Sequence, residues 1–140
     1  MRTLTTSLIV AAMATLLSTN AAQAHHSFAM FDGKTQLVKT GTVVRWAFNN
    51  PHSWLYVNVK NTDGTDTLWS FEGGGPTGLI QRGVTGDSIK PGMTVKFIYC
   101  PLRDGRNGGA VSWVRPEGGG KAFNVSDGGC VTSEEGSQKL

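Results

Sequence analysis

Cysteine, histidine and the common catalytic motifs are scarce or missing in this sequence. Its 140 residues include two cysteines and three histidines. It has no GxSxG, HExxH or CxxC motif, and Gly73-Gly74-Gly75 lacks the Lys-Ser or Lys-Thr of a phosphate-binding loop. The acids nearest to recognisable motifs, Asp32, Glu72 and Asp104, are interpreted as turn or cap residues rather than general bases. These absences predict that the protein is not an enzyme.

Excess charge and long apolar runs are missing as well. The chain has 13 lysines and arginines against 10 acids, so loss of Arg2 with a leader leaves 12 against 10, or +2. The basic residues fall singly and form no stripe, which argues against nucleic acid or an anionic membrane surface as a partner. No run of about 20 apolar residues is present, so we expect no membrane span.

Residues 1–24 have the pattern of a cleaved signal peptide. Arg2 precedes an apolar stretch from Leu8 to Leu17, and the segment ends in Ala22-Gln23-Ala24. Cleavage after Ala24 makes His25 the first residue, and cleavage after residue 21 or 22 is the alternative. No cysteine follows that would take a lipid anchor. We therefore expect a periplasmic or secreted protein.

The two cysteines, Cys100 and Cys130, both lie in the mature part. In an oxidising compartment an even pair most often forms a structural disulfide. Closing a loop of about 30 residues would stabilise the fold by about 3–4 kcal/mol in the chain-entropy view. Neither cysteine has a histidine nearby in the sequence, so we predict a disulfide rather than a redox or zinc role.

The mature residues predict an all-β fold. Short apolar–polar alternations lie between turn signals such as Asp63-Gly64. They predict strands at 36–48, 53–60, 67–72, 90–100 and 109–116, with one short helix at 77–82. In the first strand the alternation places on one face Val38, Thr40, Thr42, Val44, Trp46 and Phe48.

Three strands, a short helix and two more strands is the order of a five-stranded Greek-key barrel of the OB type. A small open sandwich is the alternative. We assign residues 25–117 to the OB-like domain and residues 118–140 to a flexible Gly/Ser-rich tail, with Cys130 as a possible tether.

Four motifs in a fixed order carry a resemblance to a known family. They are AHHSFAMFD at 24–32, NPHSW at 50–54, KPG at 90–92 and PLRDG at 101–105. With this spacing the chain resembles an uncharacterised family of small exported proteobacterial proteins, a domain of unknown function. The resemblance covers residues 24–116 and implies compartment and fold rather than an activity.

The histidines are the candidate metal ligands. A free N-terminal His25 would offer its α-amine and its ring nitrogen to one ion, and His26 or His52 would add a third nitrogen. Such a set suits Cu(II), the strongest binder of the divalent series. It is similar to the histidine brace of lytic polysaccharide monooxygenases, although only at the terminus. We therefore predict a non-enzymatic copper-binding protein. The alternative reading of the two adjacent histidines is an exposed end left by export.

A second set of residues suggests another ligand class. Trp54 lies on the face opposite the aliphatic residues of its strand, and Arg103 and Asp104 lie in the PLRDG turn. An aromatic on an OB-like surface can stack on a sugar. A module that binds a carbohydrate or small organic molecule through Trp54, Arg103 and Asp104 is the alternative function, and an envelope accessory protein acting by protein contact is the third.

Overall fold

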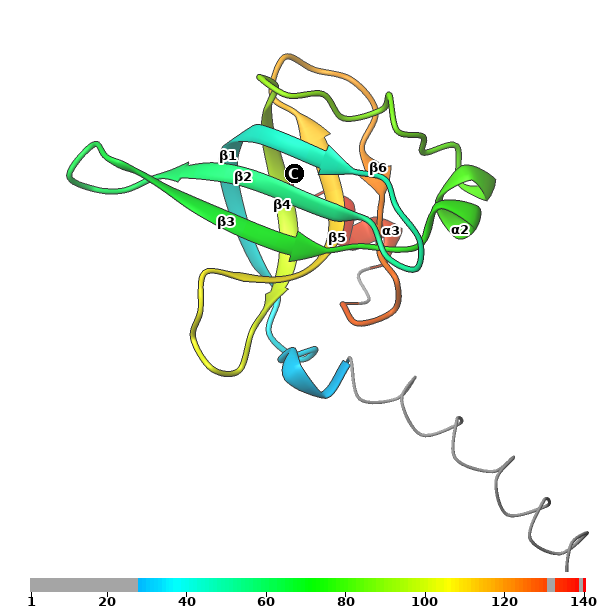
Figure 1. The fold of residues 1–140 in the computed structure, drawn as a ribbon, viewed down its shortest axis with the longest axis horizontal. Helices are drawn as coiled ribbons and strands as arrows, with labels where there is room; N and C mark the ends of the chain where they lie inside the picture. Colours follow the sequence, from blue (N-terminus) through cyan, green and yellow to red (C-terminus); the bar gives the residue numbers. More distant parts are fainter. Residues whose placement is uncertain (1–27, 131–132, 139) are drawn as a thin grey trace, which may run out of the picture.

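The computed structural model describes residues 28–130, 133–138 and 140 of the chain. Within them the strands are β1 (Leu37–Ala47), β2 (Trp54–Lys60), β3 (Asp66–Glu72), β4 (Thr94–Pro101), β5 (Gly108–Pro116) and β6 (Phe123–Asn124). The helices are the 3-10 turn η1 (Phe28–Met30), α2 (Pro76–Gln81) and α3 (Glu134–Ser137). Figure 1 shows α2 at one end of the barrel, beside the chain that follows β6.

The sheet closes on itself and forms a barrel. The strand order is β3-β2-β1-β4-β5-β6, and an additional parallel pairing joins β3 to β5. Closure removes the free sheet edges that five short strands would otherwise expose. The predicted all-β barrel, with a short helix between the third and fourth strands, is therefore confirmed.

The β2–β3 hairpin follows directly from its turn sequence. Gly64 has φ of +86°, a conformation that residues other than glycine rarely adopt. The Asp63 carboxylate accepts hydrogen bonds from the Thr65 amide (2.9 Å) and hydroxyl (2.6 Å). The turn predicted at Asp63-Gly64 is thus stabilised by its own side chains.

The aromatic and aliphatic residues of alternate positions meet inside the barrel. The Phe71 ring lies 4.8 Å from that of Phe97 and 4.9 Å from that of Tyr99, both edge-on. Leu55 and Val57 of β2 are fully buried beside them, as the alternation predicted. Edge-to-face rings add to the energy of burial itself, so this cluster forms the main core.

The single face predicted for the first strand holds from Val38 to Val44, which is the exposed face, and fails at Trp46. Val38 and Val44 are exposed, whereas Val43 is buried. The β1–β2 register shifts between Val43 and Arg45, as a β-bulge does. One extra residue reverses the in–out alternation, so Trp46 still points inward although Val44 does not.

The segment after residue 117 adds structure that the sequence did not indicate. β6 pairs with β5 through Trp113↔Asn124 and Val114↔Phe123. Val125 is buried in the main core. The segment thus returns to the barrel and contacts Gly73 and Gly74, directly after β3, before it reaches Cys130.

The predicted disulfide is present between Cys100 of β4 and Cys130. Both cysteines are fully buried and pack with Phe31 and Ala110 in a second, smaller core. Such a crosslink is typical of oxidising compartments outside the cytoplasm. No helix in the described part of the chain is long and apolar enough to cross a membrane.

Candidate functional site

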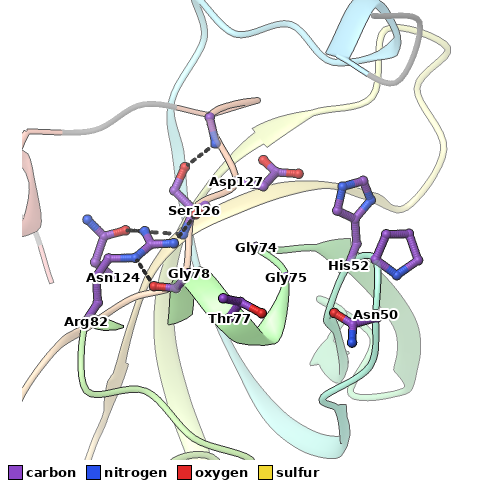
Figure 2. A pocket seen from close by; sticks show the side chains of 12 residues that line it. Asn50, His52, Gly74, Gly75, Thr77, Gly78, Arg82, Asn124, Ser126 and Asp127 are labelled. Atoms are coloured by element: carbon purple, nitrogen blue, oxygen red, sulfur yellow. Dashed lines mark hydrogen bonds between the residues drawn. The ribbon is translucent and has the colours of Figure 1, made fainter. Parts of the chain in front are cut away.

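A polar cleft of about 810 Å³ opens at the end of the barrel where α2 lies. Its walls come from the loop before β2, from the loop and helix after β3, and from the segment after β6. They comprise Asn50, Pro51, His52, Gly74, Gly75, Thr77, Gly78, Arg82, Asn124, Ser126, Asp127 and Gly128. Figure 2 shows His52 on one side of the cleft and Arg82 on the other, with Thr77 between them.

His52 is held by a buried carboxylate. Nδ1 of His52 lies 2.5 Å from Oε1 of Glu72, and the two side chains are 32% and 6% exposed. Glu72 is the last residue of β3, where its backbone pairs with Trp54 on one side and Ala110 on the other. The barrel closure itself therefore fixes the position of this carboxylate.

Asp127 brings a second carboxylate to the same place. One oxygen, Oδ1, accepts a hydrogen bond from the Gly129 amide at 2.9 Å. The other, Oδ2, is buried and has no hydrogen-bond partner among the described residues. Burial raises the pKa of Glu72; the His52 ring opposes that rise and the Asp127 carboxylate adds to it. Two carboxylates this close repel each other, and His52 is the basic side chain of the cluster that can offset them.

The segment that carries Asp127 is attached to the barrel at several points. The Gly74 amide donates to the Val125 carbonyl at 2.8 Å. The Ser126 hydroxyl donates to the Cys130 carbonyl at 2.8 Å, and Cys130 is bonded to Cys100. Asp127 is thus placed between a backbone contact on one side and a disulfide on the other.

Arg82 joins the helix to the same segment. Its Nε donates to the Gly78 carbonyl (3.1 Å), and its two terminal nitrogens donate to Asn124 Oδ1 (2.9 Å) and the Ser126 carbonyl (2.8 Å). These bonds hold the guanidinium over the cleft (Figure 2). The cleft therefore has the Arg82 guanidinium on one side and the Asp127 carboxylate on the other, with Glu72 buried in contact with His52.

The three consecutive glycines allow these segments to approach one another closely. A Cβ on Gly75 would lie 2.5 Å from the Pro51 carbonyl oxygen, and one on Gly74 would lie 2.9 Å from that of Ser126. Any side chain at these positions would push the walls of the cleft apart. The Gly-rich run thus has a packing role at the site.

His52, Glu72 and Asp127 together form a donor set for a metal ion. One ligand atom from each residue lies within 4.8 Å of the others. One imidazole nitrogen and two carboxylate oxygens suit a divalent transition metal. His52 and Glu72 already contact each other, so a metal ion would have to share or replace that contact.

Of the candidate site residues predicted from the sequence, one lies in this cluster and the others do not. His52 lies in the cluster, whereas His25 and His26 are outside the described residues. Trp54, Arg103 and Asp104 do not line the cleft. Arg103 donates to the carbonyls of Ala29 (3.1 Å, from Nε) and Met30 (2.9 Å, from the amide) and so attaches η1 to the β4–β5 turn. The Asp104 carboxylate accepts from Arg106 at 2.7 Å, within the turn.

Glu72 and Asp127 are the members of the cluster that the sequence did not single out as ligands. The interpretation of Glu72 as a turn or cap residue is wrong, because its side chain is buried and contacts His52. A weak signal was available: Glu72 is the acid that ends a strand directly before three glycines. Asp127 carried no signal, because it lies in a segment interpreted as a tail.

The fold and the site define a small, disulfide-linked β-barrel protein with a polar, carboxylate-containing cleft. The chain belongs to the family described as "Family of unknown function (DUF6152)", whose profile matches residues 13–112. His52, Glu72 and Cys100 lie inside the matched range, and Asp127 and Cys130 lie beyond it. No curated protein and no solved structure matches the chain significantly.

Proposed function

We propose that the protein is an exported, non-enzymatic binding protein for a divalent metal ion, with His52, Glu72 and Asp127 as ligands. The observation that carries the proposal is Asp127 Oδ2, a buried carboxylate oxygen without a hydrogen-bond partner among the described residues. Asp127 itself is half-buried, and it lies in a cluster with the buried carboxylate of Glu72. Two such groups repel each other unless a cation or a proton lies between them.

Copper is the ion to test first. For a site with one nitrogen and two oxygen donors, affinity rises along the first-row divalent metals up to Cu²⁺ and is lower for Zn²⁺. The disulfide supports a compartment outside the cytoplasm, where Cys100 and Cys130 remain oxidised. Zinc is the informative competitor, because it accepts the same donors and is not reduced.

The experiment is a calorimetric titration of the chain from residue 25 to 140 with Cu(II) and with Zn(II). We expect one ion per chain, and His52→Ala should weaken binding by at least about tenfold, or 1.4 kcal/mol. Glu117→Gln is the matched control, because Glu117 is exposed and outside the cleft. Equal affinity in the wild type, His52→Ala and Glu72→Gln proteins would contradict the proposal.

A second candidate function is Cu(II) binding at the mature N-terminus. It is favoured by the contact between Phe28 and Gly129, since a Cβ on Gly129 would lie 2.6 Å from Phe28 Cδ1. Gly129 is two residues from Asp127, and His26 is two residues before Phe28. Two residues of chain span at most about 7 Å. A terminus joined to Phe28 by so short a segment could therefore supply ligands to an ion held by Asp127.

One extra residue before His25 tests this candidate. It leaves every side chain in place but converts the free amine to an amide. If the terminus contributes ligands, the electron paramagnetic resonance spectrum of the Cu(II) complex should change and the affinity should fall by at least about tenfold. Identical spectra and affinities would leave His52, Glu72 and Asp127 as the site and exclude the terminus.

A further inference from the structure

We infer that the metal-loaded cleft binds a small oxyanion, which coordinates the ion on one side and contacts Arg82 on the other. The inference rests on the proposed metal site and adds the class of ligand that this site would take. The ligand would occupy the cleft shown in Figure 2, beside the ion.

The cleft is much larger than a metal ion requires. Its volume of about 810 Å³ lies in the range of pockets that hold small molecules. His52 and Asp127 lie on one side of it, and Thr77 and Arg82 extend away from them (Figure 2). An ion held by three protein ligands would keep at least one coordination position open, to which a ligand in the cleft could bind.

The charge of the cleft depends on the ion. Without metal, the Asp127 carboxylate in the lining and the Glu72 carboxylate buried beside His52 together outnumber Arg82, the one always-charged cation among the described lining residues. An anion is then repelled. A divalent ion cancels both carboxylates, so that Arg82 leaves the cleft with a positive charge. Binding of metal therefore changes the preferred ligand from a cation to an anion.

The remaining groups of the lining suit oxygen atoms rather than rings. Arg82 has five N–H groups, and bonds to Gly78, Asn124 and Ser126 use three of them. The Thr77 hydroxyl lies between Arg82 and His52 (Figure 2). Among the described residues no Phe, Tyr or Trp lines the cleft, so this part of the chain offers no large ring for stacking a sugar or a base. A carboxylate or phosphate group fits both the guanidinium and an open metal position.

The experiment compares anion binding to the whole mature protein with and without one equivalent of Cu(II). Inorganic phosphate, malonate and glucose are the three probes, titrated by calorimetry. We expect at least one of the two anions to bind the Cu(II)-loaded protein at least about tenfold more tightly than the metal-free protein. We expect glucose to bind neither form. Preference for phosphate or for malonate identifies which kind of oxyanion the cleft takes.

Two variants separate this inference from the proposed metal site. Thr77→Val should weaken anion binding by at least about threefold while Cu(II) affinity stays unchanged. Arg82→Gln should weaken anion binding as well, but it also removes the bonds to Asn124 and Ser126, so Thr77→Val is the decisive variant. Cu(II) binding without any metal-dependent anion binding would overturn the inference and leave the metal site standing. Binding of glucose alone would also overturn it. Failure of the wild-type protein to bind Cu(II) would reject the metal site itself.

Discussion

The imidazole Nδ1 of His52 lies 2.5 Å from Oε1 of Glu72, although the two residues are 20 positions apart in the chain. His52 precedes β2 and Glu72 ends β3, so antiparallel pairing of these strands brings the two together. Asp127 then approaches from the segment after β6. The site is therefore assembled by sheet closure and by the return of the C-terminal segment.

Glu72 should make the metal-free protein less stable as the pH rises. Burial, with help from Asp127, raises the pKa of Glu72 above its ordinary 4.5, so the folded state keeps the proton to a higher pH than the unfolded chain does. The stabilising contribution of that proton is complete below about pH 4.5 and disappears as the pH passes the raised pKa. The free energy of unfolding, measured by urea denaturation, should fall between about pH 4 and about pH 8, and Glu72→Gln should reduce this fall. The reduction should be about 1.4 kcal/mol for each tenfold difference between the proton affinities of Glu72 in the folded and unfolded states. Parallel curves for the two proteins would contradict this.

Asp127→Asn should weaken Cu(II) binding by at least about tenfold, because the amide loses the negative charge and keeps the shape. The matched control is Asp104→Asn, which changes an exposed aspartate of the β4–β5 turn. Isothermal titration of the two variants compares them directly. If Asp104→Asn has the larger effect, the ion binds near the PLRDG turn and the cluster is not the site.

Removal of the disulfide should affect both stability and the site. The double variant Cys100→Ala, Cys130→Ala releases a crosslink across 30 positions of sequence and the anchor next to Asp127. We expect a loss of about 3–4 kcal/mol in the free energy of unfolding, measured by urea denaturation. Cu(II) affinity should also fall, because Asp127 loses its attachment. Unchanged metal affinity in the folded double variant would indicate that the Val125 and Ser126 contacts suffice to position Asp127.

Gly75→Ala should displace the loop that forms the floor of the cleft. The added methyl group would lie 2.5 Å from the Pro51 carbonyl oxygen, which is backbone and cannot move aside alone. We expect a loss of about 1–3 kcal/mol in stability together with weaker metal binding, because Pro51 precedes His52. Gly118→Ala is the matched control, since a Cβ there meets nothing within 4 Å. Equal thermal stability of the two variants would show that the loop accommodates the methyl group.

Much of the fold could be predicted from local sequence, because strands and turns depend on neighbouring residues. The alternation of Leu55, Val57 and Val59 identified β2 and its buried face. The first strand shows where this reasoning stops. A bulge between Val43 and Arg45 reverses the alternation, and no local pattern in the sequence indicated it.

The sequence by itself determined strands β1 to β5 and the hairpin turn at Gly64, since these depend on local backbone preferences. It also determined the disulfide, because it contains two cysteines that can pair only with each other. It also pointed to His52 as a candidate ligand. Only the tertiary structure decided that His52 meets Glu72 and Asp127. The physical reason is that a carboxylate at a strand end is usually exposed, and nothing in the local sequence shows that closure of the barrel will bury it. From its sequence, segment 123–130 was predicted to be a tail. In the structure its backbone forms hydrogen bonds with β5 and with Gly74, which hold it against the barrel.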